Sequence, residues 1–261
     1  MLRGFNISPH QYQSTNPYPH MFMDNYLEEN FALKLQKEIL DIPDSDFDRY
    51  DNPFEQKYTL RDKNNYPSNL RLLMDNLTSD NFIKELSNLV GYNLINDPTK
   101  NFWGVHKYKS GDKLDIHVDA GIHPITKLKK QVTLGLYLSY EWDEKYGCDL
   151  EIWKGDNSKN SDAKIYRCVS RIPPVFNRLI IFTCDDYSWH GNPEPCQCPD
   201  KSKRIFVTLS YLSDSKNFEN NRQKAYFVAR PSDPIDLEKD QLRLLRADPV
   251  RYKEIYTYNY N

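Results

Sequence analysis

The feature that most constrains the fold is a series of short, strand-like segments between residues 102 and 212. Each segment is rich in β-branched and aromatic residues and is bounded by turn-forming residues. No helical pattern separates them, which disfavours a parallel α/β sheet. We therefore predict a β sandwich or jelly roll. The expected strands are 102–108, 113–119, 131–140, 150–153, 164–170, 178–183 and 204–212.

Helical patterns flank this β region on both sides. Apolar residues recur at helical intervals from residue 26 to residue 40 and stop before Pro43. A second helical stretch, 69–90, is expected to break at residues 78–80, where Ser79 or Asp80 can cap a new helix. Further helical patterns follow Ser213, at 237–245 and 250–256. We expect these helices to pack on the outside of the β core.

The length of 261 residues favours a single domain. We expect four parts within it: an N-terminal arm at 1–24, a helical support region at 25–100, the β core at 101–213 and a C-terminal helical extension at 214–261. The arm is expected either to drape over the body or to remain mobile.

Composition and charge narrow the classes of partner. Hydrophobic residues make up 39% and charged residues 28%, which is typical of a globular chain. The formal net charge of −2 offers no general positive field for nucleic acid or an anionic membrane. The sequence shows neither a leader-like apolar segment nor a run of about 18 apolar residues. We therefore expect a cytoplasmic protein with no nucleic-acid or membrane partner.

The five cysteines are odd in number, and most lie in strand-like segments. We interpret them as reduced thiols in a reducing compartment. Cys196 and Cys198 form a C-x-C pair, but a structural zinc site needs about four ligands, and no second pair is suitably spaced.

One H-x-D pair lies in a strand-like segment. His117 and Asp119 would project from the same face of a strand, about 7 Å apart at Cα, so that one ion could bind both. His190 follows a later strand and could complete a two-histidine, one-carboxylate set, which occupies one face of an octahedral Fe(II) and leaves three positions open. The alternative is that His190 is a hydrogen-bonded loop residue.

Arg204 begins a strand in which polar and apolar faces alternate. Arg204, Phe206, Thr208 and Ser210 share the face that suits a polar cavity, and the alternate residues suit packing beneath helices. A guanidinium turned inward is costly unless it meets an anion, and a dicarboxylate cosubstrate provides one. The alternatives are a surface arginine at the strand end, or Lys201 or Lys203 in the anchoring role.

Five motifs in a fixed order carry a family resemblance. They are Tyr108-x-x-Gly111-x-x-Leu114-x-x-His117-x-Asp119, Leu136-Tyr137-Leu138-Ser139, Gly147-Cys148-Asp149-Leu150, Arg178-Leu179-Ile180-Ile181-Phe182 leading to His190-Gly191, and Arg204 with Thr208. Residues 102–212 thereby resemble the prolyl-4-hydroxylase-type branch of the iron(II)- and 2-oxoglutarate-dependent oxygenases. Two positions depart from that branch: Leu114 stands where Tyr is frequent, and Gly147-Cys148 replaces a double glycine.

The resemblance implies a double-stranded β-helix core, with helices at both ends. It implies that His117, Asp119 and His190 are the catalytic metal ligands and that Arg204 anchors the cosubstrate. Tyr108 and Tyr137 would lie near the cosubstrate, and Thr208 beside its salt bridge. The implied cofactors are Fe(II), 2-oxoglutarate and O₂, with ascorbate as a further candidate.

The expected reaction is hydroxylation of a substrate with decarboxylation of 2-oxoglutarate to succinate. Asp119 favours hydroxylation over halogenation, because related halogenases lack this carboxylate. The unidentified substrate is a prolyl or other peptidyl residue, or alternatively an amino acid, a sugar or another small metabolite. Residues 44–67, 120–130 and 213–234 are expected to select it.

Two other functions remain open at this point. The first is a β-helix binding module that retains the metal but has lost turnover, and the second is a different metal chemistry on a cupin-like barrel. His106 and His123 flank the H-x-D pair, either as contacts around the site or, more simply, as packed strand and turn residues.

Overall fold

A computed structural model describes residues 2–160, 162–214 and 222–257. Within these ranges the strands form one curled antiparallel sheet in the order β1-β9-β6-β11-β4-β3-β5-β10-β7-β8, with β2 paired to β3 and β12 to β5. The strands are β1 (His20–Met23), β2 (Phe47–Asn52), β3 (Glu55–Leu60), β4 (Gly104–Tyr108), β5 (Lys113–Val118), β6 (Lys129–Tyr137), β7 (Leu150–Gly155), β8 (Ile165–Ile172), β9 (Arg178–Thr183), β10 (Trp189–Asn192), β11 (Arg204–Ser213) and β12 (Tyr226–Phe227).

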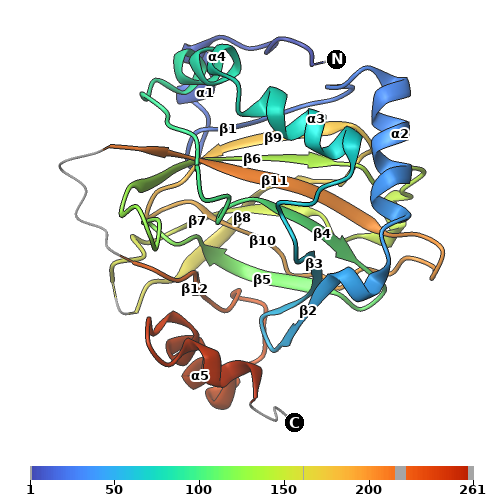
Figure 1. Ribbon diagram of the computed structural model, residues 1–261. Helices are drawn as coiled ribbons and strands as arrows, with labels where there is room; N and C mark the ends of the chain where they lie inside the picture. The colour runs from blue at the N-terminus through green and yellow to red at the C-terminus, as the bar shows by residue number, and fades with distance from the viewer. Residues whose placement is uncertain (1, 161, 215–221, 258–261) are drawn as a thin grey trace.

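The sheet curls into a jelly roll, so the predicted mainly β fold is confirmed. In Figure 1, β6, β9 and β11 form one layer, β5, β7, β8 and β10 form the other, and β3 joins them at one edge. The helices α1 (Pro9–Gln13), α2 (Glu29–Leu40), α3 (Ser68–Leu77) and α4 (Asp80–Val90) lie over the first layer, whereas α5 (Leu237–Ala247) lies below β5 and β12 (Figure 1). Short 3-10 turns occur at Asp44–Asp46, Glu144–Tyr146 and Tyr252–Tyr256.

The main hydrophobic core lies between the helices and the first layer. Ile205, Val207, Leu209 and Tyr211 of β11 are buried in it together with Leu35 of α2. The alternate residues of β11, beginning with Arg204, line a pocket on the other side of the sheet. The two faces predicted for this strand are therefore confirmed, and the strand separates the core from the pocket.

The predicted break in the second helical stretch is also confirmed. α3 ends at Leu77, and the Ser79 hydroxyl accepts a hydrogen bond of 3.3 Å from the Phe82 N–H, which caps the start of α4. Gly91, with φ of 73°, ends α4 in the left-handed conformation.

The N-terminal arm is packed and partly regular over its described residues, 2–24. Ser8 and Gln11 form a capping box at the start of α1, and β1 pairs along its whole length with β9. Tyr12 is fully buried and its hydroxyl lies 3.0 Å from the Thr183 hydroxyl. The arm therefore drapes over the body, the first of the two expected arrangements.

The segment 44–67, which was expected to help select the substrate, contains the β2–β3 hairpin. β3 pairs with β4 through Tyr58 and Thr59 and with β5 through Glu55 and Gln56. Its sequence, Glu-Gln-Lys-Tyr-Thr-Leu, is mostly polar although every residue is buried or partly buried, so the usual hydrophobic strand signature is missing. Residues of this hairpin, among them Glu55 and Lys57, line the pocket beneath β11.

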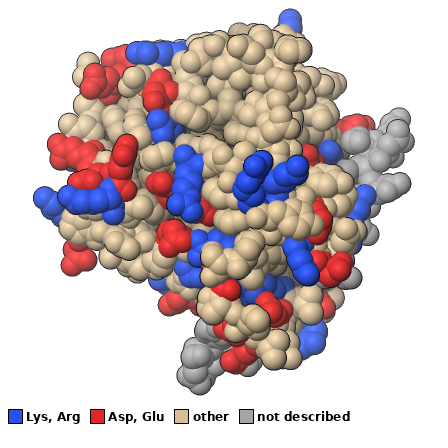
Figure 2. All heavy atoms as spheres, turned by 180° about the vertical axis from the view of Figure 1, so that it is seen from behind, with Lys and Arg blue, Asp and Glu red and all other residues tan. Residues whose placement is uncertain are grey.

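The distribution of surface charge and the character of the helices bear on the partners that the protein can have. On the face seen from behind, positive and negative side chains are interspersed, with a mostly uncharged area toward the upper right (Figure 2). Over the described ranges, no helix has the length and apolar character needed to cross a membrane.

Candidate active site

His117 and His190 face each other across two paired strands. His117 is on β5 and is directly opposite His190 on β10, while Asp119 follows the end of β5. Gly191 permits this close pairing, because a Cβ there would lie 2.7 Å from the carbonyl oxygen of Asp115. His190 is therefore a strand residue and not a loop residue.

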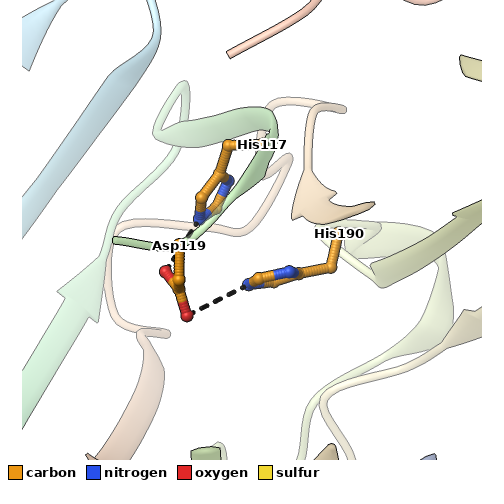
Figure 3. Close-up of side chains that lie close together, drawn as sticks. All are labelled: His117, Asp119 and His190. Atoms are coloured by element: carbon orange, nitrogen blue, oxygen red, sulfur yellow. Dashed lines mark ion pairs between the residues drawn. The ribbon is translucent and has the colours of Figure 1, made fainter. Parts of the chain in front are cut away.

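The three side chains converge on one point (Figure 3). The Asp119 carboxylate lies 3.5 Å from Nε2 of His117 through Oδ1 and 3.9 Å from Nε2 of His190 through Oδ2. One ligand atom from each residue lies within 4.8 Å of the other two. This spacing and this set of two imidazoles and one carboxylate fit a ferrous ion.

Hydrogen bonds fix both imidazoles with Nε2 toward that point. Nδ1 of His117 lies 2.9 Å from the carbonyl oxygen of Asp115, and Nδ1 of His190 lies 2.8 Å from that of Ser188. A carbonyl only accepts, so each Nδ1 carries the proton and each Nε2 of the neutral ring presents a lone pair. Such a bond on the remote nitrogen is the usual support of a metal-binding histidine.

The local electrostatics favour the metal-binding protonation states. Burial, with the neighbouring His117, lowers the pKa of His190 to about 4, so the ring is neutral near pH 7. Burial alone would raise the pKa of Asp119, but Lys130 and the two histidines hold it well below its ordinary value. The Lys130 Nζ lies 2.5 Å from Oδ2 of Asp119.

Arg204 is buried in the same pocket without an acidic partner. Its side chain is 2% exposed, Nε donates to the Cys148 carbonyl at 3.0 Å and an Nη donates to the Tyr137 hydroxyl at 3.2 Å. The other terminal nitrogen has no hydrogen-bond partner, and the guanidinium forms no ion pair within 4.0 Å among the described residues, although Asp149 interacts with it electrostatically at longer range. Such an unpaired buried charge fits a site for an anion.

Two tyrosines enclose this guanidinium. Its carbon lies 4.6 Å from the ring centre of Tyr108 and 4.9 Å from that of Tyr137. Thr208 also lines the pocket, but its hydroxyl donates to the Leu134 carbonyl at 2.9 Å. Tyr108 and Tyr137 thus contact Arg204 directly, whereas Thr208 lies four residues further along the same face of β11.

One cavity of about 430 Å³ contains all of these residues. His117, Asp119 and His190 line it together with Arg204, Tyr108, Tyr137 and Thr208. A volume of this size lies within the range of about 300–1,000 Å³ that small-molecule sites occupy. The metal-binding set and the buried guanidinium therefore share a pocket that fits Fe(II) and 2-oxoglutarate.

Of the other residues that the sequence singled out, His106 lies in the pocket wall, and His123, Lys201 and Lys203 lie outside it. His106 lines the pocket and its Nδ1 lies 2.9 Å from the Thr59 hydroxyl. His123 is buried elsewhere, 3.3 Å from Asp97. Lys201 and Lys203 do not line the pocket, which leaves Arg204 as the anchoring candidate among the three.

Sequence reasoning missed several pocket residues. Phe227 of β12 stacks on the His117 ring with a centroid distance of 5.0 Å, and Arg246 of α5 reaches the same pocket. Lys130, Lys57 and Glu55 also line it. All of these except Arg246 lie in the segments 44–67, 120–130 and 213–234 that were expected to select the substrate, but no motif singled out the individual residues.

The cysteine prediction is wrong for one pair. Cys148 and Cys196 form a disulfide, while Cys168, Cys184 and Cys198 are free. The loop after β10 folds back over residue 148, so two cysteines 48 positions apart become neighbours. The inference of a reducing compartment, which rested on free thiols, loses this support.

Comparisons with known proteins agree with this site. Residues 103–221 match the family model of the 2OG-Fe(II) oxygenase superfamily. No curated protein sequence matches the chain.

Several solved structures share the fold. One is a prolyl hydroxylase from Trichoplax adhaerens, in complex with a peptide fragment of the oxygen degradation domain of hypoxia inducible factor (18% identity, 80% of this chain and 88% of that chain covered, TM-score 0.59). Another is a prolyl-4-hydroxylase from Pseudomonas putida (12%, 79% and 99%, 0.57). A third is the non-heme alpha ketoglutarate dependent epimerase SnoN from nogalamycin biosynthesis (12%, 87% and 91%, 0.55). Residues 103–221 thus match the 2OG-Fe(II) oxygenase superfamily, and the fold of the chain is like that of the prolyl 4-hydroxylases.

Proposed function

We propose that the protein is an Fe(II)- and 2-oxoglutarate-dependent dioxygenase that hydroxylates its substrate and releases succinate. The observation that carries the proposal is the shared pocket, in which three metal-ligand atoms lie within 4.8 Å of one another and a buried guanidinium lacks an acidic partner. When bound, Fe(II), 2-oxoglutarate and O₂ supply the oxidising chemistry, and ascorbate is expected to support repeated turnover.

His117, Asp119 and His190 hold the metal in this proposal. The carbonyls of Asp115 and Ser188 orient the two rings, and Lys130 orients the carboxylate through Oδ2. Asp119 occupies the position that related halogenases leave free, which favours hydroxylation.

Arg204 anchors the distal carboxylate of 2-oxoglutarate. The planar guanidinium suits a carboxylate, and Tyr137 both accepts a hydrogen bond from Arg204 and flanks it. Tyr108 covers the other side, and Thr208 contributes to the pocket wall. Leu150, Phe182 and Phe206, also in this wall, help to exclude water.

Two substrate classes follow from different observations. The likeness to a prolyl hydroxylase in complex with a peptide supports a prolyl or other peptidyl substrate. The many cationic side chains of the pocket support a small anionic metabolite instead. SnoN shows that the fold also serves epimerisation, so the reaction type has to be measured on the product.

Binding and turnover test the proposal separately. Purified protein should bind Mn(II), and then 2-oxoglutarate, by calorimetry, and with Fe(II) it should release succinate. His117→Ala and Asp119→Ala should abolish both metal binding and succinate release, while Lys201→Ala, at an exposed position outside the pocket, should change neither. Metal binding with no succinate across a broad substrate panel would indicate a binding module, and no metal binding would refute the proposal.

A further inference from the structure

The pocket carries more positive charge than the cosubstrate can neutralise. Apart from Arg204, five cationic side chains of the described residues line it, against two carboxylates. The cations are Lys57, Lys63, Lys130, Lys224 and Arg246, and the carboxylates are Glu55 and Asp119. Lys130 and Asp119 pair with each other, which leaves one acid, Glu55, for the other four cations.

Glu55 is shared by two of these cations. Its carboxylate lies 3.2 Å from Nζ of Lys57 and 3.1 Å from Nη2 of Arg246. Glu55 is 4% exposed; burial would raise its pKa, but Lys57 and Arg246 together lower it to about 2. One negative charge thus opposes two positive charges inside the protein.

The Arg246 guanidinium is only partly satisfied. Its side chain is 11% exposed, and both Nε and Nη1 are buried without a hydrogen-bond partner. Its carbon lies 5.5 Å from the ring centre of Phe227, which in turn stacks on His117. The free donors of Arg246 are therefore close to the metal-binding strand, and leaving them unpaired is unfavourable.

Lys63 and Lys224 have no acidic partner within 4.0 Å among the described residues. Nζ of Lys63 donates only to two backbone carbonyls, each at 3.0 Å, and Nζ of Lys224 lies over the Tyr252 ring at 3.5 Å. His106, in the same wall, feels this field: burial first, and then Lys57 and Lys63, lower its pKa well below the ordinary value. The excess positive charge of the pocket lining thus extends beyond the Glu55–Arg246 pair to Lys63 and Lys224.

We infer that the substrate is a small molecule with an anionic group, a carboxylate or a phosphate, which Arg246 and Lys57 bind at the β3 and α5 end of the pocket. This inference rests on the proposed function and adds a second anion site, separate from Arg204. The cavity of about 430 Å³ must also hold the cosubstrate, which leaves room for a small substrate. A peptide backbone would leave these charges unpaired.

Paramagnetic relaxation of small probes tests this inference without knowledge of the substrate. The 261-residue chain is loaded with Mn(II) and saturated with N-oxalylglycine, an unreactive analogue of 2-oxoglutarate that fills the cosubstrate site at Arg204. Bound Mn(II) then relaxes the protons of any probe that visits the pocket. Butyrate should be relaxed about tenfold more than butyramide, since a charge-assisted pair contributes about 1.4 kcal/mol or more. Methyl phosphate, compared with trimethyl phosphate, shows whether a phosphate binds as well as a carboxylate.

Two substitutions should act in opposite directions. Arg246→Met should reduce butyrate relaxation to the level of butyramide, whereas Glu55→Gln should increase it, because it removes the acid that competes for Arg246. Both break the Glu55–Arg246 ion pair, so a purely structural role would shift both variants the same way. Arg243→Met is the matched control: Arg243 is a similarly buried residue of α5 that pairs with Asp240 and does not line the pocket.

The outcomes separate this inference from the proposed function. Three results would overturn the anion site if Mn(II) and N-oxalylglycine still bind. They are equal relaxation of butyrate and butyramide, no relaxation of either, and changes in the same direction in Arg246→Met and Glu55→Gln. Failure of the protein to bind Mn(II) or N-oxalylglycine overturns the proposed function instead, and the inference with it.

Discussion

Replacing Arg204 with Met should weaken 2-oxoglutarate binding strongly while leaving the stability of the ligand-free protein nearly unchanged. Arg204 is 2% exposed and forms no ion pair within 4.0 Å among the described residues; Asp149 interacts with it only at longer range, so its charge is weakly compensated until an anion enters. Removing one partner of a buried charge pair costs about 2–5 kcal/mol. We expect about 3 kcal/mol, which raises the Kd for 2-oxoglutarate roughly 150-fold.

The stability of the ligand-free protein follows from opposing contributions. Arg204→Met removes the hydrogen bonds to the Cys148 carbonyl and the Tyr137 hydroxyl, each contributing about 1 kcal/mol. It also removes a buried charge that lacks a counterion, and Met packs well against Tyr108 and Phe206. The free energy of unfolding should therefore stay within about 1 kcal/mol of wild type.

Calorimetry with Mn(II)-loaded protein measures the affinity without turnover, and urea denaturation measures the stability. Arg204→Lys, which keeps the charge but loses the planar fork, should give an intermediate Kd. Wild-type affinity for 2-oxoglutarate in Arg204→Met would refute the anchoring role. A loss of stability above about 3 kcal/mol would show that Arg204 is mainly a structural residue.

Three further predictions concern neighbouring groups. Lys130→Met should lower the melting temperature of the metal-free protein, because Asp119 loses its partner. The variant should also show a larger increase in melting temperature on adding Mn(II), because the metal restores a positive charge beside Asp119. Equal Mn(II)-induced increases in the variant and the wild type would contradict this. The chain, denatured without reductant, should show three titratable thiols, and five thiols would rule out the disulfide. The double variant Cys148→Ser and Cys196→Ser should be less stable by about 4 kcal/mol, because the disulfide closes a loop of 48 residues. This variant should also bind 2-oxoglutarate more weakly, because the Cys148 carbonyl holds Arg204. The metal-free protein should lose about 2 kcal/mol of stability between pH 7.5 and pH 5 through His190. The reason is that this histidine takes up a proton near pH 6.5 in the unfolded chain but, with its pKa lowered to about 4, only near pH 4 in the folded protein. If the urea midpoint of His190→Asn falls with pH as much as that of the wild type, His190 is not the cause.

The β core and the metal-binding residues could be predicted because their signals are local. Alternation along residues 204–211 is enough to assign the two faces of β11, and an H-x-D pair on a strand places both side chains together. The break before α4 could be predicted in the same way, since Ser79 is a local capping residue.

Features that depend on distant partners could not be predicted. β3 carries an ion pair between Glu55 and Lys57, and the second partner of the buried Glu55 carboxylate is Arg246, from the far end of the chain. The disulfide likewise depends on the path of the loop after β10, which no local pattern specifies. The charged wall of the pocket was therefore missed.

The placement of β3 has a consequence for how such a protein could diversify. β3 pairs along its whole length with β2 on one edge, and on its other edge it pairs with β4 at one end and with β5, which carries His117, at the other, yet it lies outside residues 103–221. An exchange of this single hairpin would leave the ferrous chemistry intact and change the lining that a substrate meets. Hairpin grafts between relatives should therefore transfer selectivity more cleanly than point changes in the core.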